Sequence, residues 1–223
     1  MNDILDKAKQ WLSATFDSET QSEIQDLINN NPQDLADRFY KDMEFGTGGM
    51  RGIMGAGTNR INKYTLGRAT QGLSNYLIEN VKKEQLSVVI AYDCRHNSKK
   101  FAKVVADVLS ANNIKVFLFE DLRATPELSF AVRHLNCDAG IVLTASHNPP
   151  EYNGYKVYWA DGGQIVPPHD GGIIGNVNSL EFSEINFNAN ENLIEIIGKD
   201  VDDVFIEASV KNGSISDKID RKN

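Results

Sequence analysis

The sequence has few cysteines and no long apolar run. Only two of its 223 residues are cysteine, Cys94 and Cys137, so a disulfide-rich secreted fold is not indicated, and we expect two buried thiols in a reducing compartment. No Cys/His group has the spacing of a metal site. No stretch of about 18 apolar residues occurs, and the N-terminus has no apolar segment of signal-peptide length. These absences predict a cytoplasmic protein without a membrane span.

Positive charge is also scarce. The chain has 23 Lys and Arg residues against 31 Asp and Glu residues, which gives a formal net charge of −8 at pH 7. The overall field of so acidic a chain does not favour binding to nucleic acid or to an anionic membrane. An anionic ligand must therefore be held by positive groups placed close to it.

The composition that is present is that of a globular protein. Hydrophobic residues make up 41% of the chain and charged residues 24%, which is enough apolar material for a core, and the length suits one large domain with or without the start of a second. Apolar residues recur at helical spacing in residues 1–40, which predicts an N-terminal helical extension. We expect the main domain in 41–190, followed by the start of a second domain or a linker in 191–223.

Apolar strands and amphipathic helices alternate in the main domain. Buried strands are predicted at 86–92, 114–120 and 139–145, each preceded by a helical segment. This β-α-β-α-β order is typical of a parallel sheet with helices on both faces. Residues 153–159 alternate and are expected to return as an antiparallel edge strand. The predicted fold is α/β, a three-layer α/β/α sandwich with a mostly parallel mixed sheet.

Polar residues follow the carboxyl ends of these strands, where open α/β sheets gather their ligands. The residues concerned are Arg95, Arg123, Ser146 and His147. Ser146 lacks the G-x-S-x-G nucleophile elbow, and adjacent side chains of an extended segment point to opposite faces. The pair Ser146 and His147 is therefore open to two interpretations, a nucleophile with its base or an ordinary exposed turn.

Two further cations have a functional and a plain interpretation. Lys156 lies in an apolar setting, where burial would suit it to proton transfer, but a lysine on an edge strand also discourages aggregation. Arg51 lies in the glycine-rich segment 45–62, where a guanidinium can bind a phosphate; alone, it is as readily a solvated charge. The glycines fit neither the P-loop pattern nor G-x-G-x-x-G, and we interpret the segment as a loop whose backbone bends tightly or approaches a ligand.

Four motifs together resemble a known family. They are FGTGGMRG (45–52), YDCR (92–95), TASHNP (144–149) and NGYK (153–156). In order and spacing they resemble the N-terminal part of the α-D-phosphohexomutases, most closely the phosphoglucomutase/phosphomannomutase branch and its longer forms. The resemblance covers residues 40 to 180 approximately and identifies 41–190 as domain I, the phosphoserine domain.

The resemblance implies roles for individual residues. Ser146 would carry a phosphoryl group, pass it to a sugar monophosphate and take back the other phosphate of the resulting sugar 1,6-bisphosphate, which interconverts hexose 1-phosphate and hexose 6-phosphate. His147 and Lys156 would complete the catalytic set. Mg²⁺ would bind the phosphate on Ser146 together with aspartates of a second domain. The implied substrate- and phosphate-binding residues are Thr47, Arg51, Arg95 and Asn148.

These roles agree with the charge of phosphoserine, which needs cations held close to it. Phosphoryl transfer itself asks mainly for positioning and charge stabilisation. The expected partners are small sugar phosphates, and the oligomeric state is left open.

The sequence also departs from the family pattern. The metal loop D-G-D-x-D-R, the sugar-selecting loop G-E-x-S-G and the phosphate loop R-x-S-G-T do not occur. We therefore expect a fragment that is inactive by itself, and glucose, mannose and pentose phosphates all stay open as substrates. The alternatives are a sugar bisphosphate synthase or phosphopentomutase using the same serine, a phosphatase using that serine, and a non-catalytic stand-alone binding domain.

Overall fold

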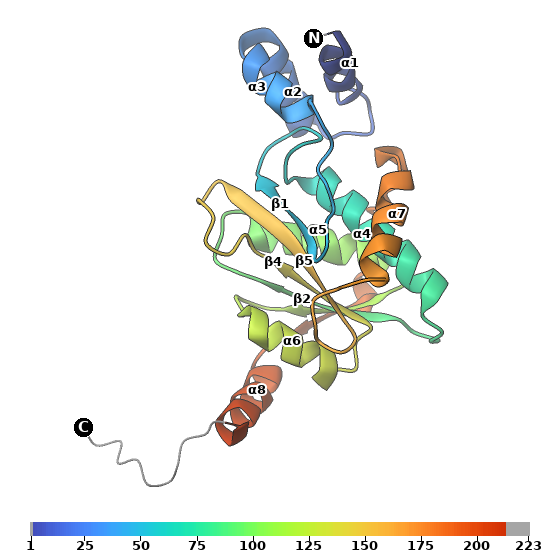
Figure 1. Ribbon diagram of the computed structural model, residues 1–223, viewed down its shortest axis with the longest axis vertical. Coiled ribbons are helices and arrows are strands. Elements are labelled where there is room, and N and C mark those ends of the chain that lie inside the picture. The colour runs from blue at the N-terminus through green and yellow to red at the C-terminus, as the bar shows by residue number, and fades with distance from the viewer. Residues whose placement is uncertain (1, 213–223) are drawn as a thin grey trace, which may run out of the picture.

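The computed structural model describes residues 2–212 and consists of one mixed sheet between two layers of helices (Figure 1). A bundle of three helices stands at one end of this sandwich. Within the described residues, none of the helices combines the length and the apolar character that crossing a membrane would require. The predicted α/β/α architecture is confirmed.

The N-terminal bundle comprises α1 (Asn2–Gln10), α2 (Ser18–Asn30) and α3 (Pro32–Phe39). Asn31 caps α3 by accepting a hydrogen bond from the Asp34 amide, and Pro32 occupies the first turn, where its missing N–H costs nothing. The helix α2 is capped by the carboxylate of Asp17, which accepts from the Thr20 amide. Short polar side chains therefore define where these helices begin.

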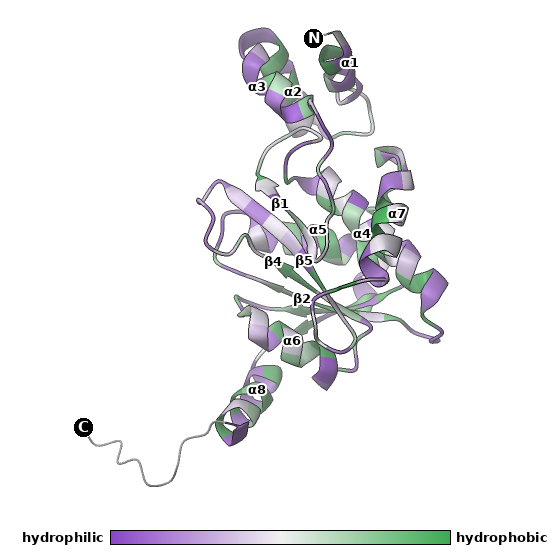
Figure 2. Ribbon diagram, in the orientation of Figure 1, coloured by the Kyte–Doolittle hydropathy of each residue, from purple (hydrophilic) through white to green (hydrophobic). Residues whose placement is uncertain are grey.

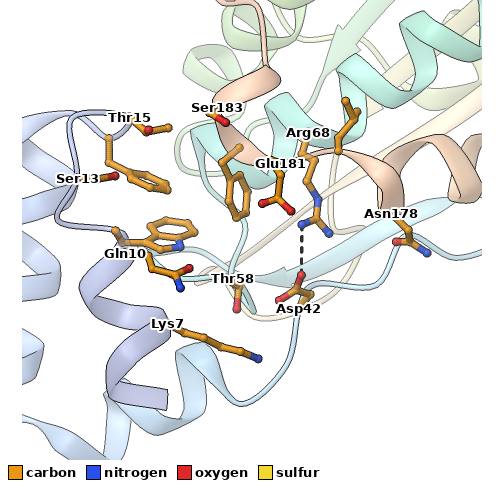
Figure 3. Close-up of a pocket in the computed structure, with 14 residues that line it drawn as sticks. Lys7, Gln10, Ser13, Thr15, Asp42, Thr58, Arg68, Asn178, Glu181 and Ser183 are labelled. Atoms are coloured by element: carbon orange, nitrogen blue, oxygen red, sulfur yellow. Dashed lines mark hydrogen bonds and ion pairs between the residues drawn. The ribbon is translucent and has the colours of Figure 1, made fainter. Parts of the chain in front are cut away.

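Aromatic side chains attach the bundle to the main domain. Trp11 stacks on Phe16 with ring centroids 4.4 Å apart, and Phe182 meets the Trp11 ring edge-on at 5.2 Å. These rings line a hollow of about 390 Å³ between the bundle and the main domain. The ion pair of Arg68 and Asp42 lies in the same hollow (Figure 3). Burial of such large rings makes the bundle part of the folded unit.

The sheet has six strands in the order β1-β5-β4-β2-β3-β6. Their bounds are β1 (Gly49–Ile53), β2 (Ser87–Tyr92), β3 (Lys115–Phe119), β4 (Ala139–Leu143), β5 (Tyr152–Trp159) and β6 (Ile194–Ile197). The strands β4, β2, β3 and β6 run parallel, while β5 is antiparallel to both β4 and β1.

Two expectations about the strands need correction. The strand β5 is antiparallel as predicted, but it does not lie at an edge, because β1 pairs along its outer side. The strand β1 itself forms within the glycine-rich segment that was interpreted as a loop. Because glycine lowers strand propensity, the local sequence does not predict β1. The strand forms through its pairing with β5.

Helices cover both faces of the sheet. On one face lie α4 (Lys63–Asn80), α5 (Ser98–Ala111) and α7 (His169–Ser179), and on the other lie α6 (Thr125–His134) and α8 (Lys199–Asn212) (Figure 1). Short 3₁₀ turns at Phe182–Glu184 and Glu191–Leu193 connect α7 to β6.

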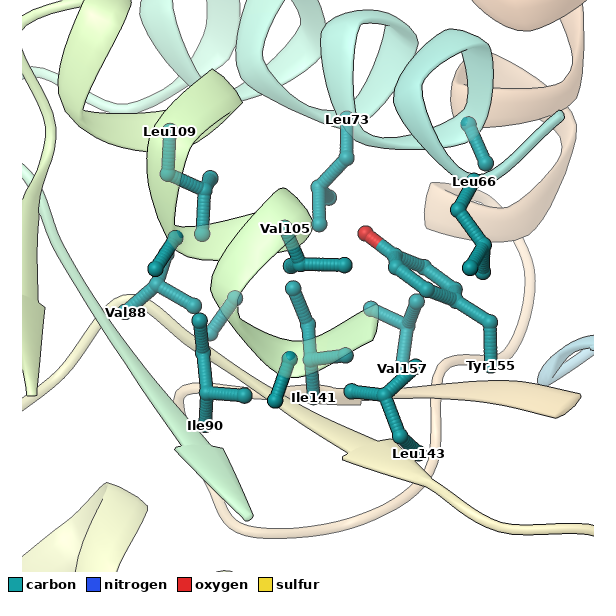
Figure 4. Close-up of a cluster of buried hydrophobic side chains, with 14 of the residues drawn as sticks. Leu66, Leu73, Val88, Ile90, Val105, Leu109, Ile141, Leu143, Tyr155 and Val157 are labelled. Atoms are coloured by element: carbon teal, nitrogen blue, oxygen red, sulfur yellow. The ribbon is translucent and has the colours of Figure 1, made fainter. Parts of the chain in front are cut away.

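The larger core lies under α4 and α5. Figure 4 shows its side chains converging from the two helices and the central strands, among them Leu66, Leu73, Val105, Ile90 and Ile141. The central strands β2 and β4 are buried along their whole length, and their hydrophobic colouring stands out in Figure 2 beside the paler β5. Burial on both faces is the reason that these parallel strands are continuously apolar.

The cysteine prediction is half right. Cys137 is buried, and burial raises the pKa of its thiol to about 11, whereas Cys94 is exposed in the turn that follows β2. Both are free thiols. Cys94 is exposed because the apolar strand before it ends two residues earlier, at Tyr92.

The strand in the last predicted segment, 191–223, belongs to this sheet. β6 pairs in parallel with β3, and Val201 at the start of α8 is buried against α6. Residues 213–223 lie outside the described part of the chain. The proposed division of the chain at residue 191 stays a prediction.

A charged cluster joins α8 to α6. The guanidinium of Arg123 binds the Asp202 carboxylate through two hydrogen bonds of 2.6 and 2.8 Å, and the buried carboxyl of Glu127 lies 3.8 Å from Arg123. Burial, together with hydrogen bonding to Asp202 and its negative charge, raises the pKa of Glu127 to about 7. Hydrogen bonding to Arg123 lowers the pKa of Asp202.

This cluster makes stability depend on pH. The pKa of Glu127 rises from 4.5 to about 7 on folding, so between these pH values the folded state binds more protons than the unfolded state. The contribution of Glu127 to stability therefore falls as pH rises through that window. We expect the midpoint of thermal unfolding to drop between pH 5 and pH 8, and to drop less in Glu127→Gln. Glu84→Gln, at an exposed site, is the control; equal drops in both variants would contradict the prediction.

Candidate functional site

Ser146 lies just beyond the carboxyl end of β4 and is exposed to solvent. Its backbone is in the left-handed region, with φ of 55°, which is uncommon for a residue other than glycine. Its amide donates to the Thr144 hydroxyl at 2.9 Å, and its Oγ lies 3.3 Å from Nδ1 of His147. The turn therefore brings together two adjacent side chains that an extended strand would separate.

The loop that carries Ser146 is built on Arg95. The guanidinium of Arg95 donates to the backbone carbonyls of four loop residues at 2.6 to 3.1 Å. These residues are Ser146, Asn148, Pro149 and Tyr152. The side chain of Arg95 is 10% exposed. Arg95, which was expected to bind phosphate, therefore contacts the backbone around the serine.

Asn148 was also expected to bind phosphate. In the structure, the backbone of Asn148 forms two hydrogen bonds: its amide donates to the Ala145 carbonyl at 3.1 Å and its carbonyl accepts from Arg95. Its side-chain Oδ1 is buried and has no hydrogen-bond partner within the described chain. Asn148 thus lies next to Ser146, but no contact assigns it a ligand.

A second set of polar residues holds the turn that carries Arg95. Asp93 accepts from the Arg95 amide and from the Ser98 hydroxyl, both at 3.0 Å. The fully buried Asn153 donates to the His96 carbonyl and to the Ser98 hydroxyl. Ser98 therefore links the two motifs, because its hydroxyl accepts from Asn153 of NGYK and donates to Asp93 of YDCR.

Arg51 and Lys156 lie on one face of the sheet, on neighbouring strands. Arg51 of β1 is opposite Gly154 of β5, so Lys156 is its diagonal neighbour on the same face, at a Cβ separation of about 7 Å. Within residues 2–212, neither cation has a carboxylate within 4 Å or a side-chain hydrogen bond. Both therefore keep their donors free for an anionic ligand.

These cations line a hollow of about 390 Å³. Its walls include the glycine turn before β1, Thr144 at the end of β4, and the side chains of Thr47, Arg51, Lys156 and Gln164. Thr47 does not leave its hydroxyl free, because it donates to the buried Asp170 carboxylate of α7 at 2.9 Å. Gln164 donates to the Gly48 carbonyl at 3.1 Å. Thr47 and Gln164 thus hold the glycine turn in place.

Ser146 opens onto a second hollow, of about 290 Å³. It is lined by Asp93, Cys94, Arg95, His96, Ser146, Asn148 and Pro150. Thr144 connects the two hollows, because it lines the first and accepts the Ser146 amide. Arg123, which also follows a strand end, instead pairs with Asp202 on the far side of the sheet and is not in the site.

The described residues contain no group of three or more histidine, cysteine, aspartate or glutamate side chains that would hold a metal ion. Of the expected Mg²⁺ site, this part of the chain offers only the oxygen of Ser146. The residues present therefore do not form a complete metal site.

Comparison with known proteins places the chain in a family. Residues 42–184 match the family described as phosphoglucomutase/phosphomannomutase, alpha/beta/alpha domain I. The chain is 44% identical over 158 residues to a phosphoglucomutase of Staphylococcus haemolyticus and 42% identical over 172 residues to a human phosphopentomutase. These matches cover 70% and 74% of the chain, but only 28% of each relative.

Solved structures agree with this assignment. The fold matches the crystal structure of a putative phosphomannomutase from Thermus thermophilus with a TM-score of 0.62 and 30% identity, over 77% of this chain and 36% of that one. All four motifs described above fall within residues 42–184. The chain therefore belongs to the phosphoglucomutase/phosphomannomutase family and contains its α/β/α domain I.

Proposed function

We propose that this chain supplies the phosphoryl-carrying serine of a sugar-phosphate mutase that interconverts hexose 1-phosphate and hexose 6-phosphate. The observation that carries the proposal is the position of two cations, Arg51 and Lys156, beside the strand end that presents Ser146; neither has an ion-pair or side-chain hydrogen-bond partner among residues 2–212. A phosphoserine brings nearly two negative charges, and these cations would offset them in a chain whose overall field repels anions. The exposed Ser146 is open to a second molecule.

The proposed reaction has two balanced steps. The bond between phosphorus and Ser146 Oγ breaks while a sugar hydroxyl forms a new bond to the same phosphorus, and the hydroxyl proton passes, through His147 or the neutral amine of Lys156, to the departing Ser146 Oγ. The sugar bisphosphate then turns over, Ser146 Oγ forms a bond to the other phosphorus as the bond from that phosphorus to the sugar oxygen breaks, and the serine proton passes to that oxygen, which leaves the isomeric monophosphate. Positioning and charge stabilisation supply most of the acceleration in such transfers.

The remaining parts of the proposal concern groups outside the described residues. Mg²⁺ would contact the phosphate on Ser146, with its other ligands outside residues 2–212, and would offset charge on that phosphate. The substrate is a glucose, mannose or pentose phosphate; the similar identities to a phosphoglucomutase and a phosphopentomutase favour neither. The cytoplasm is the proposed compartment, and we propose that these residues by themselves are inactive as a mutase.

The full-length gene product tests the proposal. It would be incubated with glucose 1,6-bisphosphate and Mg²⁺, and phosphopeptides would be mapped by mass spectrometry while glucose 1-phosphate isomerisation is followed in a coupled assay. Phosphate on Ser146 together with isomer formation supports a mutase. Net release of phosphate identifies a phosphatase, accumulation of bisphosphate identifies a synthase, and an unmodified Ser146 without turnover identifies a binding domain.

The free ammonium of Lys156 gives a quantitative prediction. In Lys156→Met, we expect phosphoryl uptake by Ser146 to slow on the order of 100-fold, because a charge-stabilising or proton-transferring group is lost from the site. Rapid-quench measurement of the phosphoserine in the full-length gene product checks this. Lys115→Met, on β3 and paired with Glu195, is the control, and a similar loss in both variants would contradict a role at the site.

A further inference from the structure

Arg95 has the appearance of a phosphate ligand in the sequence, but the structure gives it another role. We propose that Arg95 is a positioning residue, whose guanidinium holds the loop 146–152 in the shape that presents Ser146, and that it does not bind the phosphate of the substrate or of phosphoserine. The inference rests on the proposed function for its catalytic consequence. Its structural part stands on contacts within the described chain.

The guanidinium of Arg95 already uses its terminal hydrogen-bond donors within the loop. A guanidinium has five N–H donors in one plane and no acceptor. In Arg95, Nη1 donates to the carbonyls of Pro149 and Tyr152, and Nη2 donates to those of Ser146 and Asn148. All four Nη hydrogens are therefore committed to the backbone of one loop. A phosphate could gain a bidentate contact only by displacing two of these carbonyls.

The fifth donor lies beside a carboxylate of the same turn. The Nε of Arg95 is buried without a hydrogen-bond partner among the described residues and lies 3.6 Å from the Asp93 carboxylate. Asp93 therefore balances the charge of the guanidinium within its own turn. Arg51 and Lys156 are the opposite case, since their side-chain donors have no partner among residues 2–212.

Arg95 also supports the unusual backbone conformation of Ser146. Its φ of 55° is disfavoured for a residue with a Cβ, so the surrounding structure has to impose it. The two peptide groups of Ser146 are both held: its amide donates to Thr144 Oγ1 and its carbonyl accepts from Arg95 Nη2. Fixing both groups fixes the backbone dihedrals of Ser146, and with them the direction of its Cα–Cβ bond.

A lysine cannot replace this arginine. An ammonium has three donors on a flexible stem, whereas the loop presents four carbonyls that a planar fork satisfies at once. The prediction is thus that charge alone is insufficient at position 95. The conservative variant Arg95→Lys separates this role from electrostatic attraction of a phosphate, which a lysine would largely retain.

The structural experiment is hydrogen exchange by mass spectrometry on Arg95→Lys and Arg95→Ala. We expect exchange in 146–153 to accelerate by roughly tenfold or more, since amides such as Asn148 and Tyr152 are bonded within this loop. Arg123→Lys is the matched control, because Arg123 also follows a strand end, pairs with carboxylates and has a side chain 13% exposed. Unchanged exchange in both Arg95 variants would overturn the proposal, whether or not the protein is a mutase.

The kinetic experiment uses the full-length gene product. A positioning role predicts that Arg95→Lys lowers kcat on the order of 100-fold, as misplacement of a reacting group does, with KM changed less than about threefold. Guanidinium ions added to Arg95→Ala should restore part of the rate. A raised KM with kcat retained would instead identify Arg95 as a phosphate ligand and overturn the proposal.

If wild-type Ser146 takes up no phosphate, the proposed function fails while the exchange result still decides the role of Arg95. If neither variant folds, the Nη hydrogens of Arg95 in the wild-type chain are followed by nuclear magnetic resonance as sulfate is added. Signals that stay unchanged support the proposal, and signals that shift with saturation overturn it.

Discussion

Replacing Ser146 with alanine is expected to abolish phosphoryl uptake and to lower mutase turnover by about 10⁴-fold or more. The proposed reaction passes through a covalent bond to Ser146 Oγ, and removal of a nucleophile typically has an effect of this size. The side chain is exposed, and its only hydrogen bond in the described chain is with His147. We therefore expect Ser146→Ala to fold as the wild type does.

The measurement combines phosphopeptide mapping with the coupled isomerase assay and thermal unfolding. Ser179→Ala, at the exposed end of α7, is the control for loss of a hydroxyl. Full activity in Ser146→Ala with an unchanged melting temperature would exclude Ser146 as the phosphoryl carrier. It would leave the fold and the family assignment intact.

Gly49→Ala is expected to have the largest effect on stability, at least about 4 kcal/mol. A Cβ at Gly49 would lie 1.8 Å from the backbone carbonyl oxygen of Tyr155, and φ of Gly49 is 127°. Because the obstacle is backbone on the paired strand, neither side can give way without separating β1 from β5. A loss of this size is a large part of the stability of an ordinary domain.

Chemical denaturation of the purified variants checks this prediction. Gly171→Ala is the matched control, because a Cβ at this position in α7 has no other atom within 4 Å. Alanine has the higher helix propensity, so this variant should be unchanged or more stable by about 0.5–1 kcal/mol. A Gly49→Ala protein as stable as Gly171→Ala would show that β1 and β5 do not approach as described.

The same substitution links the fold to the site. Arg51 and Lys156 face one hollow because β1 and β5 pair in the register that places Gly49 opposite Lys156. Any surviving folded Gly49→Ala protein should therefore lose much of its phosphoryl uptake.

Much of the fold was predictable from local pattern. The strands β2, β3 and β4 are apolar runs bounded by polar residues and separated by helical periodicity, and burial on both faces of a parallel sheet produces that signal directly. β1 and the inner position of β5 were not predictable in this way. Both arise from pairing between segments about a hundred residues apart. The glycines of β1 interrupt the hydrophobic alternation that would otherwise indicate a strand.

The site, like the fold, was only partly predictable from the sequence. The motifs placed Ser146, His147, Arg51 and Lys156 among the candidates, and the structure brings the first two together in one turn and the last two into one hollow. The motifs could not show what a donor is already bound to. Thr47 donates to Asp170 and Arg95 to the serine loop, so residues expected as ligands hold the framework.

By itself, the sequence determined the α/β class and the resemblance to the family, and it made Ser146 a candidate, because periodicity and short motifs are local properties of the chain. Only the tertiary structure decided which cations are free to meet a phosphate. That depends on which donors the fold has already used, and hydrogen bonds between residues 51 to 123 positions apart leave no trace in the local pattern. Arg51 and Arg95 are alike in sequence character, yet one has unused donors and the other has every Nη hydrogen committed.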